Sequence, residues 1–501
     1  MNLTVDLNNT ASGADTIPFD YSTWQSHLQA GRRVAEAEHR SVLVSYTEQA
    51  PYFNLLSAFA SARDLAHDTF YWERPDEGHV LVGIGTAVTC SAETVKELAS
   101  CWRSLMERAH IHSSPADIGS GHHQVNGPLC LSGFAFDSSS ASTPLWREFP
   151  SGLLIVPAIL FGQSGASTYL TMNVLIQPPE NAEDQDAGAD EIAHKVDYAR
   201  TVLGAVERAL GGESPAQPDR PQLRRISLHD LQSRGSWKHM VEMATTAIQE
   251  GAYRKVVLAR SVLAEAPEPF IVPSTLADLS RRQKDACVFA LSRRGHTFLG
   301  ATPERLARVD GTRVETMALA GSAPRSASFD EDTQLGEELL RQKKARTEHA
   351  IVAERILEAL SPLTTVVHSR ARPELLKLAN VQHLLTPISG ELIPGTSILE
   401  VVDALHPTPA VAGEPQSAAL DAIRSVEHLD RGWYAGPIGW VGADGSGEFA
   451  VALRSALVEK NRATLFAGCG IVAGSDPQAE YDESCWKLQV MLQSLCGGYS
   501  E

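Results

Sequence analysis

The sequence predicts an α+β fold, in which strands and helices are mixed without the regular strand–helix alternation of a doubly wound sheet. Short apolar or alternating segments, typical of strands, follow one another along the chain. Longer segments with apolar residues three and four positions apart, typical of helices, lie between them at irregular intervals. With 501 residues, of which 43% are apolar and 21% charged, the chain has the composition of a globular protein with a large core.

The first part of the chain contains predicted strands at 41–46, 79–90, 152–162 and 167–177 and predicted helices at 52–67 and 192–210. Two polar stretches, 178–191 and 211–222, are rich in Pro, Gly, Ala and acidic residues, and we expect loops there. We therefore divide the chain into an N-terminal half, 1–222, and a second region, 223–501.

The second region has a denser pattern. A long helix is predicted from about 329 to 361, with shorter helices at 236–251, 278–283, 418–427 and at the C-terminus. Strands are predicted at 255–264, 287–294, 296–302, 364–369, 381–392, 433–442, 448–459 and 463–474.

Charge and composition exclude several classes of protein. The formal net charge is −18 and Lys and Arg form no clustered run, so we expect no nucleic-acid partner. The most apolar run, 153–161, is much shorter than the roughly 20 residues of a membrane-spanning helix, so we expect no membrane segment. The N-terminus has no basic and apolar leader, and the seven cysteines form no CxxC pair. We therefore expect a cytoplasmic protein.

Acidic residues on two predicted helices are candidate metal ligands. Glu348 lies in the long helix, and Glu480 and Glu483 lie in the terminal one. Carboxylates suit a hard cation such as Mg²⁺, which also takes water and substrate oxygens. The alternative is that they are exposed Glu residues of the kind that long helices carry. Glu480, Glu483 and Lys487 share one helical face, which is either a solvated salt-bridge stripe or the wall of a site.

Lys255 opens the apolar run KVVLA and allows two interpretations. Its ammonium could reach the surface at the strand edge while its stem packs on apolar neighbours. Alternatively the amine is desolvated, and a lowered pKa would then suit a general base. The glycines of GCGIVAG fit bulges or a close approach to a ligand, but no GxxxxGK[ST] or GxGxxG loop supports a nucleotide site.

Nine segments carry a more specific signal: YRKVVLARS, GATPERL, ETMALAGSAPR, RTEHAIVAERIL, VQHLLTPISGEL, LHPTPAVAGEPQ, RGWYAGPIGW, GEFAVALRSA and LFAGCGIVAGSDPQAEYDESCWKL. In this order, over about 230 to 495, they resemble the chorismate-utilising enzymes, a family of isochorismate synthases, salicylate synthases, anthranilate synthase large subunits and aminodeoxychorismate synthases. The N-terminal half matches only loosely, as that half does within the family. The resemblance implies one α+β domain of two packed, largely antiparallel sheets flanked by helices, with chorismate bound by 223–501.

The resemblance also implies the residues of the site. By position in the motifs, Glu348, Glu483 and Glu480 resemble the ligands of Mg²⁺, which would hold the ring carboxylate of chorismate. Arg454 and Lys487 resemble groups that bind the substrate's carboxylates. The further substrate contacts that the resemblance implies are Tyr434, His383, Ala410 and the backbone at Gly321, Gly468 and Gly470.

Two residues imply that water is the nucleophile. Lys255 stands where water-using members have the base, and Glu304 stands where they have the acid. Lys255 thus disfavours the ammonia-using members, so no glutaminase subunit is expected, and Ala320 replaces the nucleophilic Lys of many aminodeoxychorismate synthases. Ala410 stands where salicylate synthases tend to have Thr, which favours isochorismate as the product and leaves salicylate synthase as the alternative.

The resemblance therefore implies a Mg²⁺-dependent isochorismate synthase, which we expect to be a monomer serving menaquinone or siderophore biosynthesis. Two positions depart from the family pattern. Ala345 replaces a carboxylate one turn before Glu348, which changes the shell around the metal ligands, and Ala412 replaces a Gly or Ser in a turn. A chorismate-binding protein without activity is the alternative from another class, and the intact Lys255 and Glu304 argue against it.

Overall fold

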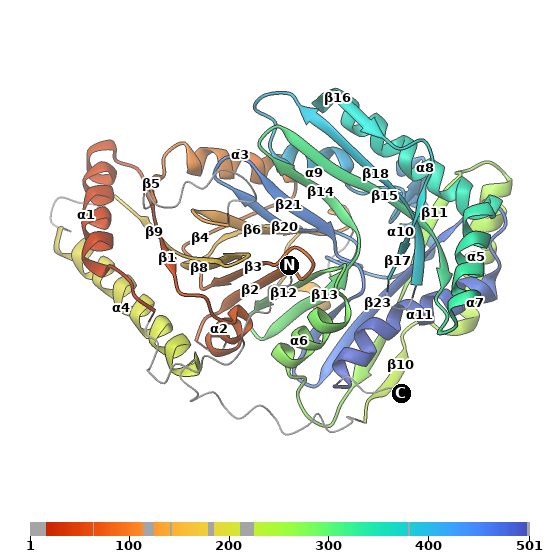
Figure 1. Ribbon diagram of the computed structural model, residues 1–501, viewed down its shortest axis with the longest axis horizontal. Helices are drawn as coiled ribbons and strands as arrows, with labels where there is room; N and C mark the ends of the chain where they lie inside the picture. The colour runs from red at the N-terminus through yellow and green to blue at the C-terminus, as the bar shows by residue number, and fades with distance from the viewer. Residues whose placement is uncertain are drawn as a thin grey trace, which may run out of the picture.

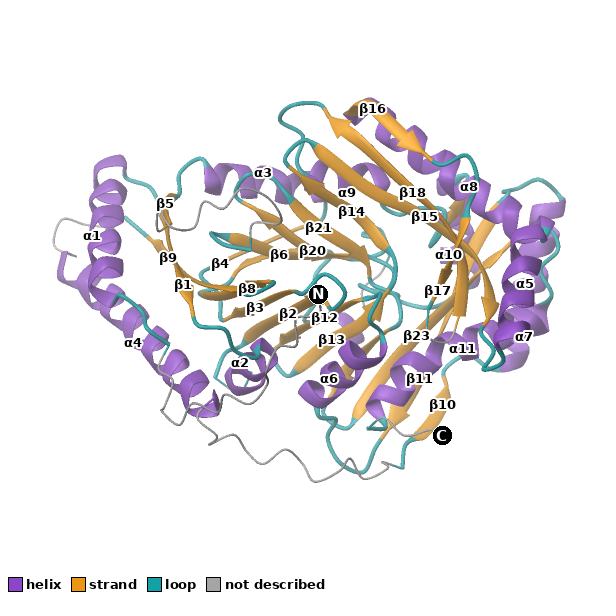
Figure 2. Cartoon of the chain, in the orientation of Figure 1, coloured by secondary structure: helices purple, strands orange, loops and turns teal. Residues whose placement is uncertain are grey.

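Two large sheets, packed face to face and flanked by helices, make up the computed structural model (Figures 1 and 2). The structure describes residues 17–63, 65–113, 125–140, 143–178, 185–210, 225–378 and 381–497, and within 185–191 it describes the backbone alone. The predicted fold class and the largely antiparallel sheets are confirmed. The predicted loop at 211–222 and the boundary after residue 222 lie outside the described residues.

Sheet A has 13 strands within the described ranges. In spatial order they are β10 (Ser227–Asp230), β11 (Lys255–Glu265), β23 (Arg462–Ile471), β22 (Ser455–Glu459), β13 (His296–Thr302), β12 (Cys287–Arg293), β2 (Asp68–Arg74), β3 (His79–Ile84), β8 (Ile159–Ser164), β9 (Ser167–Ile176), β1 (Val42–Ala50) and β5 (His110–Ser113), with β19 (Gly413–Glu414) beside β11. The two parts of the chain meet at the β2–β12 pair, where Trp72 lies opposite Phe289. The β1–β5 pair is parallel.

Sheet B has ten strands in the described part of the chain. In spatial order they are β16 (Thr364–Ser369), β18 (Val381–Leu392), β15 (Arg313–Pro324), β14 (Arg305–Asp310), β21 (Gly447–Val451), β20 (Pro437–Gly442), β6 (Leu129–Phe134), β7 (Gly152–Val156) and β4 (Val88–Ala92), with β17 (Glu374–Lys377) beside β18. Here the early and late parts of the chain meet at the β6–β20 pair, where Leu131 lies opposite Trp440.

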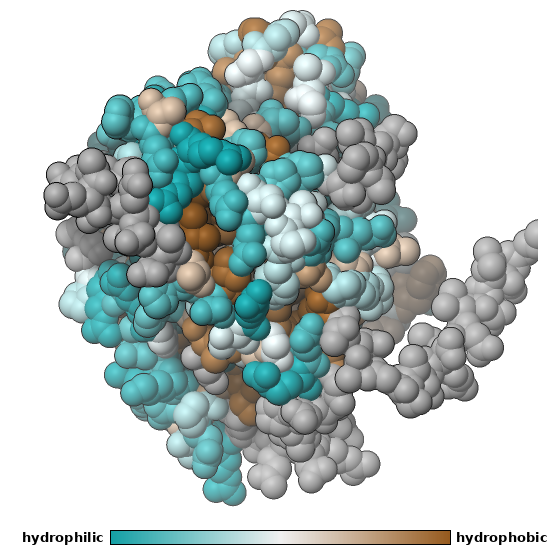
Figure 3. Space-filling view, turned by 90° about the vertical axis from the view of Figure 1, so that its left-hand side faces the viewer, coloured by the Kyte–Doolittle hydropathy of each residue, from teal (hydrophilic) through white to brown (hydrophobic). Residues whose placement is uncertain are grey.

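Helices cover the outer faces of both sheets (Figure 1). On the side of sheet A lie α1 (Tyr21–Glu38), α2 (Leu55–Ala62), α4 (Gln185–Leu210), α5 (Arg234–Gln249), α6 (Val272–Arg282) and α11 (Pro477–Leu495); on the side of sheet B lie α3 (Val95–Met106), α7 (Phe329–Arg341), α8 (Lys343–Leu360) and α9 (Ile398–Leu405); α10 (Gln416–Val426) packs on β11 and β19. On the side that carries α1 and α4, apolar side chains lie in a furrow between hydrophilic ones (Figure 3). None of the helices described is long and apolar enough to span a membrane.

Aromatic side chains fill the space between the sheets. Trp433 packs edge-on against Phe149 and Phe298, with ring centroids 5.3 and 6.4 Å away. Gly133 lies under the same indole, and a Cβ atom there would be 2.0 Å from Trp433. A second apolar cluster lies between sheet A and its outer helices.

Several predicted elements are divided in the structure. The predicted helix from 329 to 361 is two helices, because Gln342 has extended backbone (φ −63°, ψ 117°) between α7 and α8. The predicted strand at 448–459 is also two, β21 in sheet B and β22 in sheet A, and Arg454 between them has φ 48°. Single-sequence patterns cannot show these breaks, since the residues on both sides keep the same apolar spacing.

Two other predicted strands, 79–90 and 152–162, each divide between the sheets. The first becomes β3 and β4, and the second becomes β7 and β8 on either side of Pro157, which has no N–H group for a ladder. The predicted loop at 178–191 is wrong in its second part, because α4 begins at Gln185. Gln, Ala, Asp and Glu suit the first turns of a helix, so its polar composition did not exclude one.

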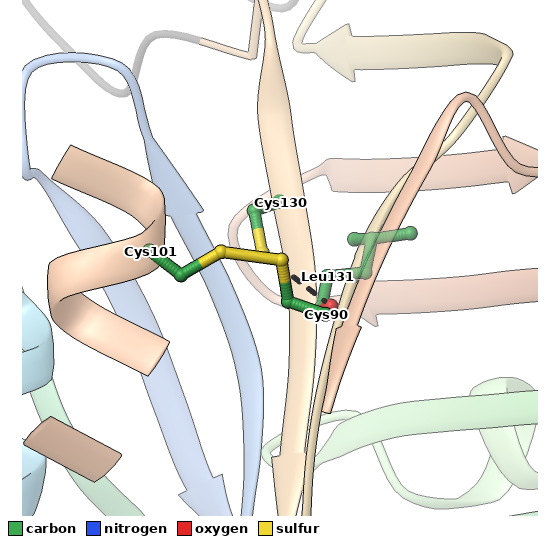
Figure 4. Close-up of a disulfide and its surroundings, with 4 residues drawn as sticks. All are labelled: Cys90, Cys101, Cys130 and Leu131. Carbon is green, nitrogen blue, oxygen red and sulfur yellow. Dashed lines mark hydrogen bonds between the residues drawn. A yellow bond between two sulfur atoms is a disulfide. The ribbon is translucent and has the colours of Figure 1, made fainter. Parts of the chain in front are cut away.

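Cys90 of β4 and Cys101 of α3 form a disulfide in the structure (Figure 4). No sequence motif predicts this pair, because the cysteines are 11 residues apart and belong to different elements. Cys130 of β6 lies beside it as a free, buried thiol, and its Sγ donates to the Leu131 carbonyl at 3.6 Å.

A buried ion triad joins the sheets. Glu448 of β21 accepts hydrogen bonds from Arg74 Nε, at the end of β2, at 2.8 Å and from Arg305 Nε, at the start of β14, at 2.9 Å. Burial alone would raise the pKa of Glu448, but the two guanidiniums hold it at about 2. The triad therefore ties a strand of sheet A to two strands of sheet B.

Glu448→Ala should lower the free energy of unfolding by about 3–5 kcal/mol at pH 7, because it leaves the buried Arg74 guanidinium without its carboxylate and leaves Arg305 with Glu77 alone. The folded-state pKa lies below the ordinary value of 4.5, so the contribution of Glu448 is present above pH 4.5 and is lost as the pH falls toward 2. Urea unfolding of both proteins at several pH values measures this. As a control, Glu337→Ala removes an exposed pair with Arg341 and should cost less than about 1 kcal/mol. Equal costs for the two variants would contradict the prediction.

Candidate active site

A cavity between the sheets brings together most of the predicted site residues. Its walls come from β11, β15, β18, β23, α8 and α11 and from four connections between elements. The predicted residues that line it are Glu304, Gly321, Glu348, His383, Ala410, Tyr434, Arg454, Gly468, Gly470, Glu483 and Lys487. The remaining two are adjacent, since Lys255 contacts Glu348 and Glu480 lines the cavity next to this one.

Lys255, the first residue of β11, is completely buried. The interpretation in which its ammonium reaches the surface is therefore wrong. Its Nζ lies 3.1 Å from Glu348 Oε1 of α8 and has no hydrogen-bond acceptor among the described residues. The amine is desolvated, and it has bonding capacity that the surrounding side chains do not use.

Gly470 makes room for this pair. It lies on β23 opposite Val257 of β11, and a Cβ atom there would be 2.2 Å from Glu348 Oε1 and 3.0 Å from Lys255 Cε. A Cβ atom this close would force Glu348 to shift, so the carboxylate and the amine meet in this arrangement because the neighbouring strand has no side chain at residue 470.

Glu304 lies where the chain leaves β13 of sheet A and enters β14 of sheet B. Burial raises its pKa to about 7, although the positive charges of Lys255 and Arg454 act in the opposite direction. Near neutral pH, this carboxyl group can therefore hold a proton and release it, which an ordinary Glu cannot do.

Arg454 lies at the reverse crossing, between β21 and β22, in a left-handed conformation that interrupts the strand. No carboxylate lies within ion-pair distance of its guanidinium in the described part of the chain, and burial lowers its pKa. The neighbouring Tyr434 stacks on Phe466, with centroids 5.1 Å apart, and burial raises its pKa to about 12. A guanidinium without a carboxylate partner among the described residues, next to a neutral phenol, has the chemistry to bind an anion.

The terminal helix α11 supplies the charged wall of the cavity. Lys487 Nζ lies 2.6 Å from Glu483 Oε1 and donates to the Gly468 carbonyl at 2.9 Å. Glu480, one turn earlier, is 2% exposed and accepts from Lys344 Nζ at 2.7 Å. The shared face is thus not a solvated stripe but lines the inner and outer cavities, and its salt bridges lie in their walls.

His383 of β18 gives the opposite wall a neutral polar group. Its Nδ1 lies 3.0 Å from Ser322 Oγ, and burial lowers its pKa well below the ordinary value. Its Nε2 is buried without a partner among the described residues. Ala410, in the connection before β19, presents only a methyl group to the cavity.

Glu480, Glu483 and Cys469 have ligand atoms within 4.8 Å of one another. Burial raises the pKa of Cys469 well above its ordinary value, and the thiol donates to the Glu480 carbonyl at 3.2 Å, so the sulfur is protonated. The two carboxylates thus fit a hard, oxygen-binding cation. Glu348, also predicted as a ligand, lies outside this group and contacts Lys255.

Lys344 was not predicted from the sequence. It lies one turn before Glu348 on α8 and lines an outer cavity with Trp486, whose side chain is 40% exposed. The outer cavity shares Gly321, Ser322, Glu348, Gly470 and Glu483 with the inner one, so the two cavities adjoin along this wall. The spacing of four between Lys344 and Glu348 was a usable signal, because it places both on one helical face.

A family model described as "Chorismate binding enzyme" matches residues 28–496, which extends the resemblance into the N-terminal half. The chain is 35% identical over 477 residues to the isochorismate synthase MenF of Bacillus subtilis, covering 94% of this chain and 97% of that protein. It is 36% identical over 471 residues to the salicylate biosynthesis isochorismate synthase of Pseudomonas aeruginosa, covering 93% of each. The solved structure of the menaquinone-specific isochorismate synthase of Escherichia coli superposes with a TM-score of 0.73 at 25% identity, covering 94% of this chain and all of that one.

Gly470→Ala should lower the free energy of unfolding by about 1–3 kcal/mol, because the new methyl group displaces Glu348 or Lys255 from their buried contact. Urea unfolding measures the loss. The matched control is Gly474→Ala, a few residues further on, where a Cβ atom would have no neighbour within 4 Å among the described residues and little change is expected. A Gly470→Ala protein as stable as the control would show that the pair is not confined by β23.

Proposed function

The chain belongs to the chorismate binding enzymes, and from this premise we propose that it is an isochorismate synthase, an isomerase that converts chorismate to isochorismate. The observation that carries the proposal is one cavity that combines a desolvated amine, Lys255, with a carboxyl group of raised pKa, Glu304. Water addition to the ring needs a base, and hydroxyl loss needs an acid. A binding protein without activity has no use for this combination.

Chorismate enters as a dianion, and the cavity offers it cationic and neutral donors. Arg454 and Tyr434 bind the enolpyruvyl carboxylate, since the guanidinium has no carboxylate partner of its own among the described residues. Lys487 and the backbone at Gly468 and Gly470 bind the ring carboxylate. His383, Gly321 and Ala410 line the remaining surface and set the position of the ring.

We assign the metal as Mg²⁺ and its ligands as Glu480, Glu483 and Glu348. Carboxylates at the wall of a substrate cavity suit Mg²⁺, which keeps open positions for water and substrate oxygens. When bound, it supplies positive charge that holds the ring carboxylate. Glu348 must turn away from Lys255 to join the other two, and this movement would release the amine for proton transfer.

The reaction then follows from two proton transfers. Once Glu348 has turned away, Lys255 lacks the carboxylate that favours its ammonium form. Its neutral Nζ then takes a proton from water as the water oxygen bonds to C2 of the ring. The ring double bonds shift, the C4–oxygen bond breaks, and Glu304 gives its proton to the departing hydroxyl group, which leaves as water. Burial of both groups excludes bulk water that would otherwise compete for these protons.

The pathway and the setting are further proposals. We propose menaquinone biosynthesis, supported by the similarity over nearly the whole chain to the menaquinone-specific enzyme of Escherichia coli; siderophore biosynthesis is the alternative. The salicylate biosynthesis enzyme of Pseudomonas aeruginosa is itself an isochorismate synthase, so its similarity does not favour the salicylate synthase reading. We also propose a cytoplasmic monomer without a glutaminase subunit, with the catalytic residues in 223–501.

Incubation of the purified protein with chorismate and Mg²⁺ should yield isochorismate without pyruvate, as resolved by liquid chromatography. Chelation of the metal should stop the reaction, and added Mg²⁺ should restore it. Lys255→Ala should lower kcat by about 10²-fold or more while the protein stays folded. Stoichiometric pyruvate would identify a salicylate synthase instead, and bound but unconverted chorismate would identify a binding protein.

The pH dependence of kcat/KM should report Glu304. An acid must be protonated, so its contribution is present below its pKa and is lost as the pH rises through about 7. Steady-state rates across this range should show the decline on the alkaline side. Glu304→Gln should reduce kcat by about 10²–10⁴-fold and abolish that decline in the residual activity. A residual activity with the wild-type alkaline limb would assign the limb to another group.

A further inference from the structure

Lys344 forms a salt bridge at the entrance to the metal site. It is the second residue of α8, and its Nζ lies 2.7 Å from Glu480 Oε1 of α11. The Glu480 side chain is 2% exposed and the Lys344 side chain is 32% exposed. Both partners of the salt bridge line the outer cavity. Its acceptor, Glu480, belongs with Glu483 to the group whose ligand atoms lie within 4.8 Å of one another.

We propose that Lys344 is an internal cation that competes with Mg²⁺ for Glu480. In the absence of metal its ammonium neutralises this carboxylate, and it is displaced into the outer cavity when Mg²⁺ binds. The inference rests on the proposed function, which makes Glu480 a metal ligand.

The charges around the cavity support this role. Each of the three proposed metal ligands is paired with a lysine: Glu348 with Lys255 at 3.1 Å, Glu480 with Lys344 at 2.7 Å and Glu483 with Lys487 at 2.6 Å. Buried carboxylates without such partners would be strongly destabilising, so the site is built to be stable without metal. A metal ion can bind only by replacing part of this compensation.

Lys344 is the lysine that can leave. Lys255 is completely buried within sheet A, and Lys487 donates a second hydrogen bond to the Gly468 carbonyl at 2.9 Å. Within the described residues, the Lys344 ammonium donates to Glu480 alone, and it lines the open outer cavity. The break in the helix at Gln342 lies just before it, so its ammonium can return to water with little rearrangement.

Displacement also couples the metal to the substrate. The three lysine–carboxylate pairs cancel, and Arg454 adds one positive charge. A dication and a dianion bring in equal and opposite charges. Mg²⁺ alone would leave the site with excess positive charge, and chorismate alone would leave it with excess negative charge. Each ligand should therefore bind more tightly in the presence of the other, by the same factor.

Titration calorimetry of Mg²⁺ into the full-length protein at pH 8 tests the role of Lys344 without any measurement of activity. Lys344→Met should bind Mg²⁺ about tenfold more tightly than the wild type, because the competing ammonium is gone. Lys344→Arg, which keeps the charge, should stay close to the wild type. Lys343→Met changes the exposed neighbour and is the matched control, with no change expected.

Thermal melting provides a second readout. Without metal, Lys344→Met should melt at a lower temperature than Lys343→Met, and saturating Mg²⁺ should remove the difference. If Lys344→Met misfolds, Lys344→Gln, which keeps a donor and removes the charge, should show the same direction of change. Mg²⁺ binding by Lys344→Met that is equal to or weaker than that of the wild type would overturn the proposal while leaving the proposed function intact. A wild-type protein that binds no Mg²⁺ would overturn both.

Discussion

The position of the site depends on the buried triad of Arg74, Glu448 and Arg305. Arg305 opens β14 directly after Glu304, and Arg74 closes β2 in the other sheet. Glu448 is 3% exposed and Arg74 is 4% exposed, so water cannot replace their ion pair. Separation of the two groups would therefore cost a large amount of free energy. The strand ends are therefore held together, and the short connection that carries Glu304 is fixed in place above the cavity.

Glu304, the proposed acid, and Arg454, the proposed carboxylate-binding residue, are positioned by the same feature of the fold. Each lies in a segment where the chain passes from one sheet to the other, and backbone hydrogen bonds join these segments to their neighbours: Val451 N donates to the Glu304 carbonyl at 3.0 Å, and Ala301 N donates to the Arg454 carbonyl at 3.2 Å. Within a strand, successive side chains point to opposite faces of the sheet, but residues at such crossings do not have to follow this alternation. Their side chains can therefore point into the space between the sheets while their backbones remain bonded to neighbouring segments.

The sequence predicted the fold class and most residues of the cavity, but by different routes. Apolar periodicity located many of the strands, whereas the identity of the cavity residues came from the resemblance, since Lys255 taken alone also fitted a surface lysine. Periodicity missed the breaks at Gln342 and Arg454, which depend on where the chain changes direction in space. It also missed the pairing of Lys344 with Glu480, because that contact joins helices 136 residues apart. Partners of this kind are set by tertiary packing, which local spacing does not encode.

The balance of charges also explains how a chain with a net charge of −18 can bind a dianion. Burial makes nearby charges dominate over distant ones, which water and salt screen, so the pairs around the cavity decide its potential. The same balance means that removal of one charged member alone lowers the stability, because its partner then lies in the cavity wall without compensation. Activity lost on such a substitution therefore mixes a lost chemical role with a disturbed charge balance. A variant that keeps the charge and changes the shape, compared with one that keeps the shape and removes the charge, can distinguish the lost chemical role from the disturbed charge balance. This holds for each lysine and each carboxylate of the site.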